Sequence, residues 1–315
     1  MIVTVTPNPS VDRTVLVDVV VRGEVTRARS ARVDPGGKGV NISRALTAHG
    51  TSTTAVLPVG GSEGRLLCDL LAEAGVHAVA VPITMSTRAN ISILEPDGTT
   101  TKINEPGPLL DQDEQERLLA AVIGQLHEHP SWLVGCGSLP PGLDADFFAR
   151  LVRAGTDHGI RVAIDTTHTP LVLAAQAGAA LLKPNREELA EATGRTLDTI
   201  GDVVLAAESL RTPGGQVIVS LGEHGALLVD EQGAVLAAAT AATTRAPVST
   251  VGAGDSLLAG FLHAGTNDAA ALATGVAWGT AAVSLPGSQM PGPADVAGID
   301  VKLSEPPSSL LLATA

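Results

Sequence analysis

The sequence predicts an α/β protein, a three-layer αβα domain with a mostly parallel sheet, plus a small β sheet. Three observations support this prediction. Short runs rich in Val, Ile, Leu or Ala, bounded by Gly, Pro or polar residues, are typical of buried parallel strands. Segments of helical periodicity separate these runs, which indicates repeated βα units. Two further segments instead alternate apolar and polar residues around turn signals.

The predicted strands of the main sheet cover 2–6, 53–59, 131–135, 161–165, 179–182 and 216–220. The predicted helices between them cover 40–49, 63–74, 111–126, 145–158, 186–193 and 202–210. Right-handed crossovers bring the loops after parallel strands to one edge of the sheet, where ligands bind in such folds. We expect residues 1–315 to form a single domain, with a loosely ordered tail from Ser304.

The two alternating segments are 15–33, around a Gly-Glu turn, and 89–103, around the hairpin signal Pro96-Asp97-Gly98. We expect them to form a lid of antiparallel character, made by about residues 13–33 and 88–105. Such a lid would exclude water from a site beneath it. Two other interpretations stay open: the strands extend the main sheet, or they form a dimer contact.

Composition limits the location and partners of the chain. With 315 residues and 44% hydrophobic residues it reads as soluble and globular, and no apolar run approaches the ~20 residues of a membrane span. The start has no basic region typical of a signal peptide. Cys68 and Cys136 lack Cys or His companions, which argues against disulfides and zinc and favours a cytoplasmic location. A net charge of −13 makes nucleic acid and anionic membranes poor partners.

Lysine is scarce, because the chain has only Lys38, Lys102, Lys183 and Lys302. Three of the four lie in segments rich in Gly, Pro or Asn that are also candidate site loops. If this acidic protein binds phosphates, it needs cations placed locally. These lysines are therefore the first candidates for phosphate contacts.

The strongest motif is the run Ser249-Thr250-Val251-Gly252-Ala253-Gly254-Asp255-Ser256, which precedes an apolar helix. Its glycines leave backbone N–H groups uncovered at a helix start, where the helix dipole also favours an anion. A carboxylate beside an anion hole makes sense if a hydroxyl is deprotonated while it attacks a phosphoryl group. The alternative is a simple turn with Asp255 in the first helical turn.

Two segments suit a sugar. In 34–41 three glycines allow close backbone approach, and Lys38 and Asn41 add polar groups, although the spacing is not that of a Walker A loop. Asp12 follows the first strand, where its carboxylate could accept hydrogen bonds from vicinal hydroxyls. An Asx turn is the alternative for Asp12.

Two segments suit a nucleotide. In 183–188, Asn185 and Glu188 could lie near a magnesium–phosphate cluster, or could form a capping box at a helix start. The glycine-rich turn 220–226 follows a strand and is apt for close contact with a nucleotide. By itself, that turn resembles many others.

Together these segments resemble the ribokinase-like (phosphofructokinase B) family of carbohydrate kinases. The matching motifs are Pro-Gly-Gly-Lys-Gly-x-Asn at 35–41, Gly-Ser-Leu-Pro-Pro-Gly at 137–142, Lys-Pro-Asn-x-x-Glu at 183–188 and Val-Gly-Ala-Gly-Asp-Ser at 251–256. The opening residues 4–12 resemble the branch that acts on phosphorylated ketohexoses. That branch includes 1-phosphofructokinase, tagatose-6-phosphate kinase and the minor 6-phosphofructokinase.

The resemblance implies a ribokinase-like fold and transfer of the γ-phosphate of ATP, with Mg²⁺, to a sugar phosphate. The substrate that it favours is fructose 1-phosphate, giving fructose 1,6-bisphosphate. Asp255 is then the base, and the amides of Gly252, Ala253 and Gly254 stabilise the transferred group. The implied substrate-binding residues are Asp12, Arg27, Gly36, Gly37, Lys38, Asn41, Arg88, Asn90, Lys102, Ser138 and Ser249. The implied nucleotide-binding residues are Lys183, Asn185, Ser220, Gly222, Gly225 and Thr250, and Glu188 organises the magnesium.

Two other classes of protein compete with this interpretation. A non-catalytic sugar-phosphate-binding protein could keep the fold, although an intact Asp255 argues against it. A dinucleotide-dependent oxidoreductase would need Gly-x-Gly-x-x-Gly after the first strand, where this chain has Pro7-Asn8-Pro9-Ser10. A homodimer through the lid is open, because the exposed edge of a lid sheet often pairs with a partner.

Overall fold

The fold is built on a ten-stranded sheet, in a computed structural model that describes residues 1–240 and 248–312. The strand order is β14-β13-β12-β11-β10-β9-β8-β1-β4-β5. From β11 to β5 all neighbours are parallel, whereas β12, β13 and β14 pair antiparallel at one edge. The bounds are β1 (Ile2–Val5), β4 (Thr53–Val59), β5 (His77–Pro82), β8 (Trp132–Cys136), β9 (Arg161–Asp165), β10 (Leu181–Leu182), β11 (Gln216–Ser220), β12 (Ala226–Asp230), β13 (Gly233–Ala239) and β14 (Val301–Ser304).

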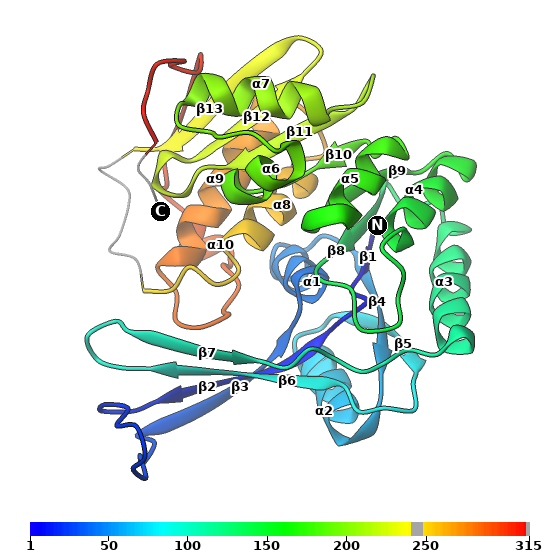
Figure 1. Ribbon diagram of the computed structural model, residues 1–315, viewed down its shortest axis with the longest axis vertical. Helices are drawn as coiled ribbons and strands as arrows, with labels where there is room; N and C mark the ends of the chain where they lie inside the picture. Colours follow the sequence, from blue (N-terminus) through cyan, green and yellow to red (C-terminus); the bar gives the residue numbers. More distant parts are fainter. Residues whose placement is uncertain (241–247, 313–315) are drawn as a thin grey trace.

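Helices cover both faces of this sheet, which confirms the predicted three layers (Figure 1). On one face, β-strand residues such as Val3 and Leu133 share a core cluster with helices α3 to α7. On the other, Ile2 and Val134 share a cluster with α1, α8 and α9. The helices are α1 (Lys38–Ala48), α2 (Gly61–Glu73), α3 (Gln112–Leu126), α4 (Phe147–Asp157), α5 (His168–Gln176), α6 (Arg186–Thr193), α7 (Ile200–Leu210), α8 (Ala253–His263), α9 (Ala269–Val283) and α10 (Pro293–Val296).

A second, four-stranded sheet projects from the three layers, in the order β3-β2-β6-β7 (Figure 1). Its strands are β2 (Ser10–Leu16), β3 (Ser30–Gly36), β6 (Arg88–Leu94) and β7 (Thr100–Asn104). Because this is a separate sheet, the interpretation that its strands extend the main sheet is wrong. Both outer pairs are antiparallel as predicted, but the central pair β2–β6 is parallel. Strand β2 begins before the predicted segment 15–33, and β3 ends after it. No strand occupies 17–29.

The two faces of the small sheet differ in chemistry. Cross-strand register places Asp12 beside Asp34 and Asn90, and Lys102 beside Ser92, so these polar residues share one face. The opposite face carries Val11, which is buried in a cluster with Leu67 and Leu71 of α2. Helix α2 therefore supports the base of the apolar face and leaves the polar face available to a ligand.

All predicted strands of the main sheet and all predicted helices occur, within two residues at each end. The prediction of a loose tail from Ser304 is wrong as far as Leu312. Strand β14 pairs with β13, and the Leu310 carbonyl accepts a hydrogen bond from the Ile200 amide at the start of α7. Leu312 is buried, so the tail adds to the core. No helix in the described part of the chain is long and apolar enough to span a membrane.

Candidate active site

The N-terminal ends of α1 and α8 meet through a side-chain hydrogen bond. Asn41 Nδ2 donates to Asp255 Oδ2 at 2.8 Å, although the two residues are 214 positions apart. Asp255 lies in the first turn of α8 and is only 7% exposed. The fold thus joins the glycine loop predicted for the sugar to the residue predicted to be the base.

The glycine run before α8 leaves the start of that helix open. Gly252 has φ +77° and caps the helix without a side-chain hydrogen bond. Among the described residues, the amides of Gly252 and Gly254 donate to no acceptor, and the Ala253 amide lies 3.4 Å from the Thr250 carbonyl oxygen. An ideal Cβ on Gly254 would lie 3.2 Å from Lys183 Nζ. Uncovered amides and an adjacent ammonium group together favour an anion at this position.

Asp165 is a central residue of the site that sequence reasoning missed. Its carboxylate is fully buried and contacts two of the scarce lysines: Lys38 Nζ at 2.6 Å and Lys183 Nζ at 2.9 Å. The available signal was its position as the last residue of a buried parallel strand, at the edge where ligands bind. Lys38 and Lys183 therefore contact the same carboxylate. The sequence predicted a sugar role for Lys38 and a separate nucleotide role for Lys183.

Burial and the neighbouring charges set the pKa of each ionisable group in this cluster. Burial, and the nearby Asp165 charge, raise the pKa of Asp255 to about 6, against the opposing effect of Lys38, Asn41 and Lys183. Burial would raise the pKa of Asp165 as well, but Lys183 and Lys38 outweigh it and hold that pKa below its usual value. Burial opposes the charge of Lys38, yet Asp165, Glu188 and Asp255 outweigh it and raise the pKa of the ammonium group.

The segment 183–188 forms the capping box that was one of its two predicted interpretations. Asn185 and Glu188 form a reciprocal capping box: Asn185 Oδ1 accepts from the Glu188 amide at 2.7 Å, and Glu188 Oε2 accepts from the Asn185 amide at 2.8 Å. The other carboxylate oxygen, Glu188 Oε1, lies 3.7 Å from Lys38 Nζ. The cap therefore holds Glu188 with one oxygen facing the charged cluster. Asn185 also forms a parallel bridge with Ser220, which brings the two nucleotide segments together.

Asp12 lies within strand β2, so the Asx-turn alternative is wrong. Its Oδ1 accepts hydrogen bonds from Ser10 Oγ at 2.7 Å and from Asn90 Nδ2 at 3.0 Å. Any Cβ on Gly36 would overlap this carboxylate, which explains a glycine at that position. The next glycine, Gly37, has φ +111°, a conformation that glycine adopts without strain.

Arg88, predicted to hold the substrate phosphate, is already anchored by backbone carbonyls. Its guanidinium donates to the carbonyl oxygens of Asn8 at 3.1 Å and Glu105 at 2.9 Å. Burial lowers its pKa, and Asp12 and Glu105 partly offset that effect. Asn8 in turn donates to Ser138 Oγ at 3.1 Å, which brings the 137–142 motif beside β6.

Several predicted residues are not joined to this network. Arg27 and Lys102 are exposed, and within the described residues neither side chain makes a hydrogen bond or ion pair. Ser249 Oγ donates to the Gly287 carbonyl at 3.0 Å. A Cβ on Gly225 would overlap the backbone of Ala237, which explains the glycine at that position. Gly222 has φ +58° at the start of a short 3₁₀ turn.

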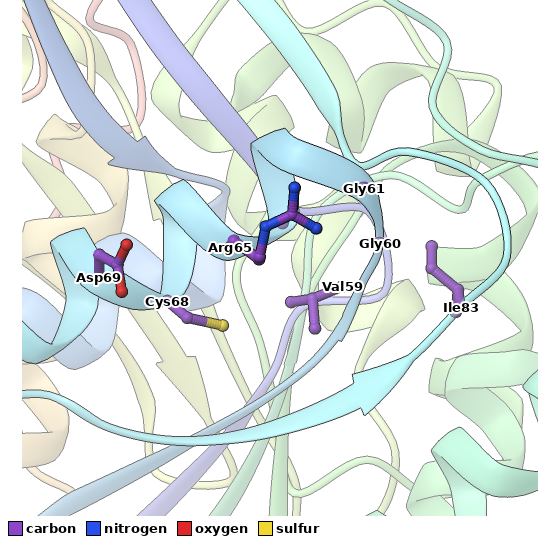
Figure 2. A pocket seen from close by; sticks show the side chains of 8 residues that line it. Val59, Gly60, Gly61, Arg65, Cys68, Asp69 and Ile83 are labelled. Carbon is purple, nitrogen blue, oxygen red and sulfur yellow. The ribbon is translucent and has the colours of Figure 1, made fainter.

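A hollow of about 400 Å³ lies elsewhere, beside the start of α2 (Figure 2). None of the residues predicted for the site is among those that line it, which are Val59, Gly60, Gly61, Gly64, Arg65, Cys68, Asp69 and Ile83.

The fold and the site define a class: an α/β protein with an open helix start, a buried carboxylate in its first turn, and a small sheet that projects from the main domain. Comparison with known proteins agrees. The model of the pfkB family of carbohydrate kinases matches residues 6–295. The chain belongs to this family.

Among curated proteins, a 1-phosphofructokinase of Haloferax volcanii is 38% identical over 301 residues, covering 94% of this chain and 95% of that protein. An ATP-dependent 6-phosphofructokinase isozyme 2 of Mycobacterium tuberculosis is 36% identical, covering 91% and 85%. Among solved structures, a tetrameric inhibited form of Escherichia coli phosphofructokinase-2 superposes with a TM-score of 0.84 at 32% identity, covering 94% and 96%. A ribokinase of Thermotoga maritima shares the fold, with a TM-score of 0.73 at 23% identity and coverage of 94% and 97%. The architecture is therefore ribokinase-like.

Proposed function

We propose that this carbohydrate kinase transfers the γ-phosphate of ATP to a ketohexose phosphate, with fructose 1-phosphate as the preferred substrate and fructose 1,6-bisphosphate as the product. The observation that supports it best is the Asn41–Asp255 hydrogen bond beside the open start of α8. It unites a buried carboxylate, a sugar-side loop and an anion site in one place.

In the proposed reaction Asp255 takes the proton of a sugar hydroxyl. That oxygen forms a bond to the γ-phosphorus while the bond from this phosphorus to the bridging oxygen of ADP breaks. With a pKa of about 6, Asp255 is ionised at neutral pH and still able to accept a proton. The amides of Gly252, Ala253 and Gly254, with Lys183 beside them, stabilise the charge on the transferred group.

The described residues fit a Mg²⁺ ion that arrives with the nucleotide. They contain no cluster of three His, Cys, Asp or Glu side chains that could hold a resident metal. Mg²⁺ at phosphates usually keeps several waters and takes one or two carboxylates. Glu188 Oε1 is the oxygen that we assign to organise those waters, and the bound ion would neutralise phosphate charge.

We assign the sugar to Asp12, Asn41, Asn90 and the glycine loop, and its existing phosphate to Arg88, with Arg27 and Lys102 closing over it. Residues 1–315 then act as one kinase domain, and 13–33 with 88–105 as its lid. Similarity to the Haloferax 1-phosphofructokinase favours a 1-phosphate, whereas the Mycobacterium relative keeps a 6-phosphate as the second candidate. We further propose a cytoplasmic enzyme that forms a homodimer through the lid.

One assay tests the substrate. ADP release is measured with fructose 1-phosphate, fructose 6-phosphate and tagatose 6-phosphate at equal concentrations of MgATP. We expect the highest kcat/KM with fructose 1-phosphate. Equal or higher values with a 6-phosphate would overturn the substrate but leave the chemistry intact. Binding of all three without ADP release would favour a non-catalytic sugar-phosphate-binding protein.

The role of Asp255 is tested by Asp255→Asn, which keeps the size of the side chain and removes the base. We expect kcat to fall at least ~10²-fold. The circular dichroism spectrum should stay unchanged. Near-normal turnover by the folded variant would exclude Asp255 as the base.

A further inference from the structure

Arg44 is a buried cation one turn after Asn41 on α1, with its side chain only 11% exposed. Its Nη1 donates to three oxygens: Asn41 Oδ1 at 3.3 Å, the Pro35 carbonyl at 3.1 Å and the Ser288 carbonyl at 3.0 Å. A buried guanidinium is costly unless its donors find acceptors. The contact with Asn41 connects this charge to the proposed base.

Both ends of the Asn41 amide are occupied. Its oxygen accepts from Arg44, and its nitrogen donates to Asp255. If the amide rotated by 180°, its oxygen would face the Asp255 carboxylate and its NH₂ group would face the guanidinium, so both contacts would become repulsive. We propose that Arg44 is a positioning residue that fixes the Asn41 amide so that it donates to Asp255.

Arg44 also ties this pair to the small sheet. Its second nitrogen lies 3.8 Å from Asp34 Oδ1 of β3, which also pairs with Arg32 at 2.6 Å, and the Pro35 carbonyl belongs to the same strand. Arg44 therefore contacts both β3 of the small sheet and, through Asn41, the proposed base.

The inference rests on the proposed role of Asp255, but its main test does not require turnover. The free energy of unfolding in urea is measured from pH 4.5 to 8.5 for the protein and for Asp255→Asn. The pH dependence of the difference reports the pKa of Asp255 in the folded state. The same pair is measured in the Arg44→Met background.

Without Arg44 the Asn41 amide loses its preferred orientation, and its hydrogen bond no longer favours the ionised carboxylate. We expect the pKa of Asp255 to rise by about half a pH unit or more. We also expect kcat to fall about tenfold, the acid limb of kcat/KM to move in the same direction, and KM for the sugar phosphate to change less than about threefold.

Arg211→Met is the matched control. Arg211 is another mostly buried arginine that donates to backbone carbonyls, those of Thr212 and Gly215. We expect it to lower stability without moving the pKa of Asp255. In an Asn41→Ala background, Arg44→Met should no longer move that pKa. If Arg44→Met does not fold, Arg44→Lys takes its place and should give a smaller rise.

An unchanged pKa of Asp255 in the Arg44 variant, or an equal rise in the Asn41→Ala background, would overturn the inference. The proposed function fails separately, when folded Asp255→Asn keeps its turnover. Because the urea measurement gives the pKa in either case, the two failures are distinguishable.

Discussion

At the scale of single residues, the site depends on the balance between two buried carboxylates and two lysines. Asp165 and Asp255 would repel each other strongly without Lys38 and Lys183, because all four groups lie in or beside the core. The lysines compensate Asp165 more than Asp255. Asp165 therefore stays ionised, while Asp255 keeps a pKa suited to accepting a proton.

This arrangement predicts a pH-dependent cost in stability. The folded protein holds the Asp255 proton up to its raised pKa of about 6, whereas the unfolded carboxyl group releases it near the ordinary pKa of 3.8. The contribution of Asp255 to the free energy of unfolding is thus fully present below about pH 4. It is lost as the pH rises through 6. We expect Asp255→Asn to raise the free energy of unfolding at pH 8 by up to about 3 kcal/mol. The gain should vanish near pH 4, and a gain that does not depend on pH would contradict the assigned pKa.

The sequence revealed the site residues that occur in dense motifs and missed those that stand alone. Asp255, Asn41 and Lys183 were found because each lies among glycines or prolines near a helix start. Asp165 and Arg44 were missed because neither is in such a motif, and their importance comes from long-range contacts. A long-range contact leaves no local signature of its own: Asn41 and Asp255, 214 positions apart, were found only because each also lies in a motif.

At the scale of the element, helix α8 begins where an anion is expected to bind. Gly254 has no positive φ, so alanine fits the backbone there, but its methyl group would lie 3.2 Å from Lys183 Nζ. We expect Gly254→Ala to stay folded and to lower kcat by ~10- to 100-fold, because the methyl crowds Lys183 and blocks the amides.

Gly124→Ala provides the control, since Gly124 lies in α3 with open space around its Cβ position. It should raise stability by about 1 kcal/mol and leave kcat unchanged. Full activity of folded Gly254→Ala would contradict an anion site at the start of α8.

In helix α6, Glu188 has a structural role as a cap, which leaves one of its oxygens for the proposed magnesium role. Glu188 caps the helix with one oxygen and faces Lys38 with the other. We expect Glu188→Gln to retain the cap and to raise the Mg²⁺ concentration for half-maximal activity about tenfold, as measured by titration with MgCl₂ at fixed ATP.

Glu114→Gln changes an equivalent capping box on α3. We expect it to leave the magnesium titration unchanged. An equal effect of both substitutions would mean that Glu188 acts only through the cap.

Some elements were outside what the sequence could show. The six helices that the sequence predicted lie within two residues of their predicted ends, and α3, α6 and α7 have capping boxes there. Helix α9 was not predicted, although Asp268 caps it. Strand β14 and the ordered tail were missed, because only pairing with β13 and α7 orders them. The parallel β2–β6 pair was missed for a similar reason: hairpin signals report neighbours in the chain and not pairs across the sheet.

At the scale of the whole molecule, the small sheet presents a polar face that includes Asp12, Asn90 and Lys102. The Lys102 side chain makes no hydrogen bond or ion pair within the described residues, yet it shares this face with the residues assigned to the sugar. We expect Lys102→Gln to raise KM for the sugar phosphate about fivefold, roughly 1 kcal/mol, while kcat stays within twofold.

Lys302→Gln on β14 is the matched control, because it removes an exposed lysine from a strand of the main sheet. It should leave both constants unchanged in steady-state assays at constant ionic strength. If both substitutions raise KM equally, the effect is one of net charge, and Lys102 has no place in a lid.

The bond between Asn41 and Asp255 also has a consequence for synthesis of the chain. A nascent polypeptide leaves the ribosome from its N-terminus, so the sugar-side loop emerges 214 residues before its partner. Central strand β1 likewise waits for β8 before both of its edges are paired. Every truncated product that stops before α8 lacks Asp255, so we expect a prematurely released fragment not to consume ATP by the proposed chemistry.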